Sequence, residues 1–323
     1  MCLQLLHLVT LRRLVGPHRL TSLDSNLSYV PFLHLLPALQ HLKLDANTAW
    51  ATEQRLTRLD LGSLVASESL RVLEIDAGEA ELEYLDQLTQ LRNLVLLDPL
   101  VPAGMSAACD NFPRSLTRLK LQMSEWDAHT EDSEFMPALA GPALQAFQGQ
   151  LQSLTLDPPF AGELDSSQLS ALPCLQQVTH LKLGSGMDTR LGGRLALGSL
   201  QFLRLEMIDW PAGQYPQGLD LTSCSKLQSL SLSFLRGMDN EAQTLDIRGI
   251  TGCRAATLDL RLNLDHHMRA SADFSGWKLK TVHITCGTHN GRWRAEQSVR
   301  DLIGALANCL PMRKILVDGK RLA

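Results

Sequence analysis

Residues that could do chemistry gather near the C-terminal end of the chain. His266, His267, His283, Cys286 and His289 lie in one short stretch, and His and Cys side chains bind zinc when three or four of them converge. No CxxC pair accompanies them, and the spacing places His283 on an expected strand and Cys286 and His289 in the turn after it. We therefore expect surface histidines and a buried thiol rather than a zinc site, and no bound metal.

Catalytic and nucleotide-binding motifs are missing from the rest of the sequence. It contains no P-loop, no G-x-S-x-G elbow and no H-E-x-x-H helix. Gly184-Ser185-Gly186 follows an expected strand, but it lacks the third glycine and the helix start of a phosphate-binding loop. We therefore expect a turn there, and a protein that has no catalytic residues, binds no cofactor and is not an enzyme.

One apolar pattern recurs along almost the whole chain and must form the elements that position any functional residue. About one residue in five is leucine, and the copies lie about 24 residues apart on average. The Leu-x-x-Leu-x-Leu string appears at Leu39-Leu42-Leu44, Leu56-Leu59-Leu61, Leu91-Leu94-Leu96, Leu116-Leu119-Leu121, Leu151-Leu154-Leu156, Leu200-Leu203-Leu205 and Leu227-Leu230-Leu232. Looser copies fill the gaps at Leu70-Leu73-Ile75, Val178-Leu181-Leu183, Ala255-Leu258-Leu260, Leu279-Val282-Ile284 and Met312-Ile315-Val317.

The end of each copy alternates at period two, which predicts a strand with one apolar face. A single strand of this kind cannot bury its leucines, whereas stacked copies form a parallel sheet with a continuous core. Each buried leucine contributes about 1.5–3 kcal/mol to stability relative to an exposed one. The buried leucines of every copy therefore stabilise the fold substantially.

With this repeat the chain resembles the leucine-rich-repeat family over almost its whole length, and in particular its irregular intracellular members, such as F-box and algal leucine-rich-repeat proteins. The resemblance implies an α/β solenoid, a curved horseshoe with a parallel sheet on the concave face and irregular or helical segments on the convex face. The family's turn asparagine is present only at Asn47 and Asn263, so we expect uneven curvature and irregular turns.

The pattern predicts one solenoid over residues 1–323. We expect degenerate N-terminal repeats over 1–35 and central repeats over 36–294. An acidic insertion lies near 122–150, around Trp126, with a short helix at about 136–148. A capping helix and strand are expected over 295–323. Since no capping segment precedes the first repeats, an incomplete N-terminus or a missing upstream domain is an open alternative.

Residues between the leucines should line the concave face and form a protein-binding surface. Glu74 and Asp76, together with Asp60, make an acidic zone. Arginine and aromatic residues often anchor interfaces, although charges on strands also simply keep a sheet soluble. A mostly basic stretch follows over the middle repeats, and we expect it to bind an acidic segment of a protein partner; it comprises Arg118, Lys120, His180, Lys182, Phe202 and Arg204.

Bulk composition narrows the classes of partner. A net charge of −4 lacks the basic excess of a general nucleic-acid binder, so we expect no nucleic acid and a monomer. The 7 cysteines are scattered and odd in number, which favours free buried thiols in a reducing compartment. Neither a signal peptide nor an uninterrupted apolar stretch of about 18 residues is present. We therefore expect a protein of the cytoplasm without a membrane partner.

The leading hypothesis is a non-catalytic scaffold for protein–protein interaction. Alternatives are a substrate-recognition subunit of an F-box-type ubiquitin ligase, although no F-box-like helical segment precedes the repeats, and a cytoskeletal or axonemal protein. A GTPase activator is a further possibility, but no positioned Arg or Asn stands out for that role.

Overall fold

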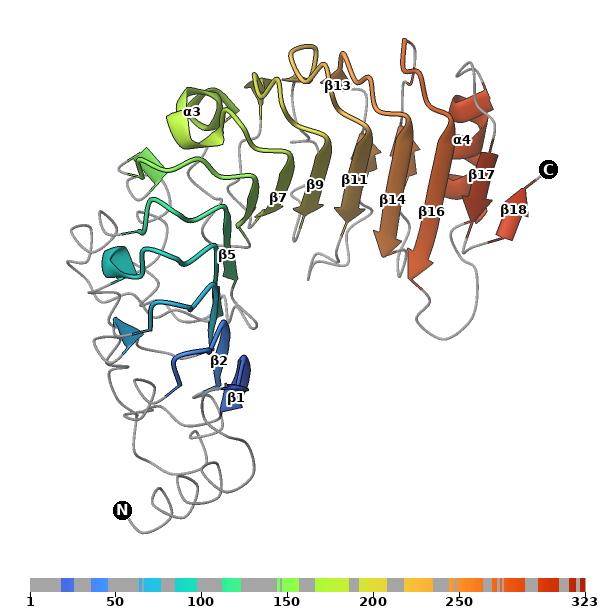
Figure 1. Cartoon of the computed structure of the whole chain (residues 1–323). Coiled ribbons are helices and arrows are strands. Elements are labelled where there is room, and N and C mark those ends of the chain that lie inside the picture. Colours follow the sequence, from blue (N-terminus) through green and yellow to red (C-terminus); the bar gives the residue numbers. More distant parts are fainter. Residues whose placement is uncertain are drawn as a thin grey trace, which may run out of the picture. The chain divides into compact units, whose positions relative to one another are not determined.

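Two compact units make up the chain, Met1–Leu151 and Gln152–Ala323 (Figure 1). The computed structural model describes residues 19–25, 36–45, 64–65, 67–76, 85–97, 112–122, 144–145, 147–156, 166–185, 192–207, 218–234, 244–246, 249–263, 269–271, 274, 276–287, 296–307, 314–317 and 320–322.

The first unit is built on parallel strands that pair in the order in which they occur along the chain. Each described strand is five residues or shorter, and the 3-10 turn η5 spans Leu85–Gln87. The strands are β1 Ser22–Ser25, β2 His41–Asp45, β3 Val72–Asp76, β4 Asn93–Leu97 and β5 Arg118–Gln122.

The second unit has the same design, and most of its main strands are six or seven residues long. Its parallel strands are β6 Ser153–Leu156, β7 His180–Ser185, β9 Phe202–Met207, β11 Ser229–Phe234, β14 Thr257–Asn263, β16 Thr281–Gly287 and β17 Lys314–Val317. One antiparallel strand, β18 at Lys320–Leu322, pairs with β17.

Smaller elements lie between these strands in the second unit. The helix α3 spans Ser166–Ala171 and the 3-10 turn η8 spans Pro173–Leu175. Short parallel strands form two minor sheets, with β8 Gly193–Arg194, β10 Leu219–Asp220 and β13 Ile250–Thr251 in one, and β12 Thr244–Asp246 and β15 Arg269–Ser271 in the other. The helix α4, Glu296–Ala307, contacts β15.

Aligned leucines form the core of each unit, because parallel pairing without a register shift puts equivalent residues side by side. In the second unit Leu181 pairs with Leu203, and Leu203 with Leu230. All three are buried, whereas the residues between them lie on the other face of the sheet. The same holds for Leu94 and Leu119 in the first unit. Alternation at period two therefore separates a dry inner face from an open outer face.

In the segment that precedes a strand, backbone hydrogen bonds join residues three positions apart. The N–H of Val178 donates to the carbonyl of Leu175, and the N–H of Leu175 to that of Leu172. All three residues are buried. Equivalent bonds join Leu91 to Leu88 and Leu88 to Leu85. A bond from i to i−3 is the geometry of a 3-10 turn, so apolar residues at every third position reach the core.

A repeated carbonyl contact links neighbouring strands at their beginnings. The carbonyl of Gln152 accepts the N–H groups of Thr179 and His180, and the carbonyl of Thr179 accepts those of Gln201 and Phe202. Hydroxyl side chains add to this ladder. Ser115 donates to the carbonyl of Leu91 at 2.7 Å, which satisfies a carbonyl of the preceding repeat.

The structure confirms the predicted strands around Leu119, Leu154, Leu181 and Leu203. The helix α4 and strand β17 lie within the expected C-terminal segment. The copy at residues 56–61 lies outside the described residues, and β2 pairs directly with β3. Most of the acidic insertion, including Trp126, also lies outside them. Of the short helix expected at about 136–148, residues 144–145 are described and are helical.

Sequential parallel strands with few helices are compatible with a solenoid-like repeat architecture of the α/β class.

Candidate functional site

The candidate site lies on the face of the sheet opposite the buried leucines, which we call the open face. In the first unit Glu74 lies on β3, with a carboxylate oxygen 3.0 Å from the ammonium of Lys43 on β2. Asp76 ends β3, but its side chain lies outside the described part. The expected acidic zone is therefore partly neutralised, because Lys43 pairs with Glu74.

Arg118 and Lys120 lie on β5 of the first unit, Arg118 exposed and Lys120 half-buried. Strand β4 separates them from the acidic residues of β3, and Val95 stands between Glu74 and Lys120 in the register. The other residues of the expected basic stretch belong to the second unit.

In the second unit the structure brings His180 and Phe202 together. They pair in register on β7 and β9, and their rings stack with centroids 4.4 Å apart and planes inclined by 16°. Phe202 is 38% exposed and is the exposed large hydrophobic side chain among the described residues. An apolar ring held rigid by a stacked neighbour suits an interface anchor.

A hydrogen-bond chain orients the His180 ring. The hydroxyl of Thr179 lies 3.0 Å from the carbonyl of Gln152, to which it donates its only proton. His180 Nδ1 lies 2.9 Å from the same hydroxyl.

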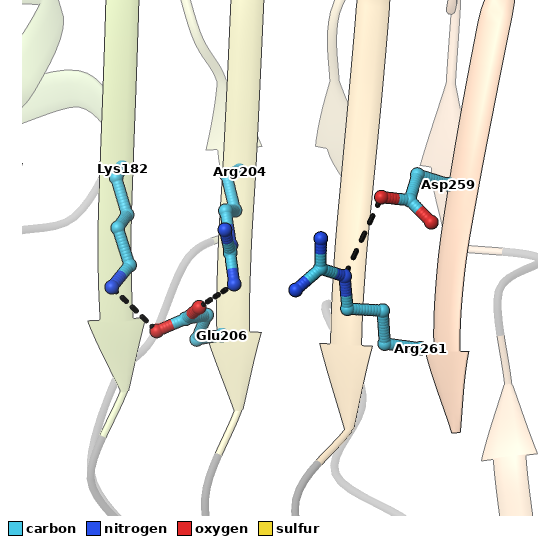
Figure 2. Close-up of polar contacts among 5 residues, drawn as sticks. All are labelled: Lys182, Arg204, Glu206, Asp259 and Arg261. Carbon is cyan, nitrogen blue, oxygen red and sulfur yellow. Dashed lines mark ion pairs between the residues drawn. The ribbon is translucent and has the colours of Figure 1, made fainter. Parts of the chain in front are cut away.

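Next to the stacked rings, one carboxylate joins two cations. Glu206 Oε2 lies 2.8 Å from Lys182 Nζ, and Glu206 Oε1 pairs with Arg204 Nη2. Figure 2 shows the carboxylate between the two strands, with one oxygen directed to each cation. Gly184 is the register partner of Glu206 on β7.

The bridge leaves a polar atom of Arg204 unsatisfied. Arg204 Nε is buried and has no hydrogen-bond partner within the described part of the chain, and the same is true of Ser231 Oγ. The two residues are paired in register on β9 and β11. A buried donor without an acceptor costs about 1–3 kcal/mol.

Three serines make β11 unlike its neighbours. Ser229, Ser231 and Ser233 occupy all the open-face positions of the strand that the structure describes, and we call them the serine row. Beyond it, on β14, Arg261 Nε lies 3.5 Å from Asp259 Oδ2. Figure 2 shows the Arg261 guanidinium directed from β14 toward β11. Ser233 pairs with Glu206 on one side and Arg261 on the other, and it is buried.

Sequence reasoning placed Lys182, His180, Phe202 and Arg204 on one surface, and the structure brings these four together. It missed the role of Glu206, which neutralises much of the charge that made the stretch look basic. The signal was present, since Arg204 and Glu206 are two residues apart and therefore share a strand face.

The described cysteines are not reactive groups of this site. Cys174, Cys224 and Cys253 are buried and form no disulfide within the described part of the chain, as predicted for these three. Burial raises the pKa of the Cys174 thiol to about 11. It also raises that of Cys224, whose Sγ lies 3.3 Å from the carbonyl oxygen of Leu195. Both stay protonated at neutral pH and are poor nucleophiles.

No group of three or more His, Cys, Asp or Glu side chains within the described ranges is placed to hold a metal ion. Of the five residues considered for zinc, His283 lies exposed on β16. The side chains of Cys286, His266, His267 and His289 lie outside those ranges. No helix within those ranges has the length and hydropathy to cross a bilayer.

Comparison with known proteins identified no relative of this chain. No protein-family model matches the chain, and no curated protein matches it in sequence.

Proposed function

We propose that the chain is a leucine-rich-repeat solenoid that binds a protein partner on its open face and catalyses no reaction. The open face would be the concave face of the horseshoe. The leucine spacing, the sequential parallel strands and the period-three turns support the repeat assignment.

One observation carries the binding proposal. The exposed Phe202 ring, stacked on His180, lies beside the cluster of Lys182, Arg204 and Glu206. Aromatic and arginine side chains provide most hot spots of protein interfaces, and a rim of charges around an apolar anchor is the usual arrangement. Parallel strands of a repeat array also present a surface suited to extended partners.

The test compares the wild-type protein with a variant that carries His180→Ser and Phe202→Ser. Each immobilised protein is incubated with extract of the native host, and the bound proteins are identified by mass spectrometry. We expect at least one partner of the wild type to be lost from the variant, because truncating an interface anchor typically costs 2 kcal/mol or more, about thirtyfold in affinity.

A matched control removes the same number of surface side chains away from the open face. Lys226→Ser and Lys278→Ser serve this purpose, since both residues are exposed in turns before β11 and β16. The melting temperature should be nearly the same in all three proteins. Identical sets of bound proteins for all three would refute binding at this face.

A further inference from the structure

One ring face of Phe202 is left uncovered on the open face of the second unit. Phe202 stacks on His180 of β7 with nearly parallel planes, so its other ring face is directed toward β11. The register partner on that side is Ser229, whose side chain ends at Oγ and is too short to cover a phenyl ring. This explains why Phe202 is 38% exposed although β9 has a strand on either side.

The spacing of the strands fits a third ring at this position. Neighbouring strands lie about 4.8 Å apart, and the rings of His180 and Phe202 have their centroids 4.4 Å apart. A ring that continued the stack would therefore lie over β11, at the register level of Ser229. The next residue at this level is Thr257 on β14, which also has a short side chain and leaves space for a planar group.

The residues at this register level include no aspartate, glutamate, lysine or arginine from β6 to β16. We call them the Phe202 line, and in order across the strands they are Ser153, His180, Phe202, Ser229, Thr257 and Thr281. The ion pairs of the open face lie two and four residues farther along the strands. A segment that crosses the strands along this line is therefore matched in charge when it is itself uncharged.

We propose that the protein partner inserts one aromatic side chain over Ser229, where it continues the stack of His180 and Phe202, and that uncharged residues flank this side chain. The inference rests on the proposed function and names the chemistry of the partner. Stacked aromatic rings contribute to affinity beyond the apolar area that they bury, which favours an aromatic ring over an aliphatic chain. His180 already holds the Phe202 ring, so little conformational entropy is lost when the stack is extended.

A nucleobase is also planar, but it brings a phosphate with it. The Phe202 line offers this phosphate no lysine or arginine, and the cations nearest to the line, Lys182 and Arg204, are paired with Glu206. The net charge of the chain, −4, adds repulsion. A protein segment therefore fits this surface better than a nucleic acid does.

The probe is an N-acetylated, C-amidated heptapeptide of serine and glycine with 4-fluorophenylalanine at its centre. Its binding to the full chain is measured by fluorine NMR titration, which suits weak affinities. We expect a dissociation constant on the order of 1 mM, since a single anchor supplies only part of an interface. Phe202→Ala removes the ring on which the probe stacks and should weaken binding about tenfold.

Ser229→Phe places a ring of the chain itself where the partner's ring would lie, and should also weaken binding about tenfold. Ser229→Ala is the matched control, because it removes the hydroxyl but leaves the ring face of Phe202 open, and should keep the affinity within about twofold. Melting temperatures of the variants establish that each is folded. A competing peptide with cyclohexylalanine at its centre should bind about fivefold more weakly than the same peptide with phenylalanine.

No binding of the probe by the wild type, unchanged affinity of Ser229→Phe or Phe202→Ala, or equal affinities of the cyclohexylalanine and phenylalanine peptides would overturn the inference. So would an oligothymidylate that displaces the probe more effectively than the phenylalanine peptide does. If host partners are lost from the variant with His180→Ser and Phe202→Ser but still bind Ser229→Phe, the stacked ring is ruled out while the proposed function stands.

Discussion

Ser231 and Arg204 are register partners on neighbouring strands, and each buries a polar atom that has no hydrogen-bond partner within the described residues. Elsewhere in the fold, hydroxyls at strand beginnings are well satisfied. Ser115 donates to the carbonyl of Leu91 in the preceding repeat. Ser115 and Ser231 therefore differ in their contribution to the stability of the fold, and the difference can be measured.

Replacing each of these two serines by alanine should have opposite effects on stability. Ser115→Ala removes a hydrogen bond and should lower the free energy of unfolding by about 0.5–1.5 kcal/mol. Ser231→Ala removes an unsatisfied hydroxyl and should leave that free energy unchanged or raise it by about 1 kcal/mol. Urea unfolding of both variants checks this, and equal destabilisation by the two would show that Ser231 has a partner.

Truncation of one aligned leucine should be costly. Leu203 is buried between Leu181 and Leu230, so Leu203→Ala should lower the free energy of unfolding by about 2–5 kcal/mol. Thr257→Ala on the open face is the comparison, with an expected change within about 0.5 kcal/mol. Similar losses for both would mean that the inner and outer faces of the sheet are wrongly assigned.

Two glycines with positive φ should respond differently to alanine. Gly252 has φ of 65°, and a Cβ there would lie 2.8 Å from the backbone nitrogen of Thr222. Gly218 has φ of 82°, but its Cβ would meet nothing within 4 Å. Gly218→Ala should cost about 1 kcal/mol from backbone strain alone, and Gly252→Ala clearly more. Thermal unfolding ranks the two variants by stability. A larger loss for Gly218→Ala than for Gly252→Ala would contradict the close approach of Gly252 to Thr222.

The pKa of the Cys174 thiol, raised by burial from 9.0 to about 11, predicts slow alkylation and a loss of stability in alkali. The unfolded thiol ionises above pH 9, while the folded thiol keeps its proton until about pH 11. The unfolded state therefore releases protons first, and the contribution of Cys174 to stability, complete below pH 9, falls between pH 9 and about 11.

Iodoacetamide labelling at pH 8, followed by peptide mass spectrometry, checks the first part of this prediction, with urea-unfolded protein as the control. Urea unfolding of Cys174→Ser and the wild type across pH 8 to 11 checks the second. Labelling of Cys174 at the same rate in native and unfolded protein would contradict its burial.

Much of the fold could be predicted because its signal is local. Leu181 and Leu183, or Leu203 and Leu205, occupy alternate positions of one strand, and a strand must place such residues on one face. The candidate site was predictable only in part. His180 and Phe202 were expected on the outer face, but nothing in the sequence says that their rings stack.

The sequence by itself determined which residues lie inward and which outward, because strand alternation depends only on neighbours along the chain. The tertiary structure decided which outward residues meet. Glu206 reaches Lys182 because β9 pairs with β7 in one particular register. The length of the segment that connects the two strands does not determine this register. Only that register turns an apparently basic surface into an internally paired cluster, since an electrostatic contact depends on distance in space and not on position in the chain.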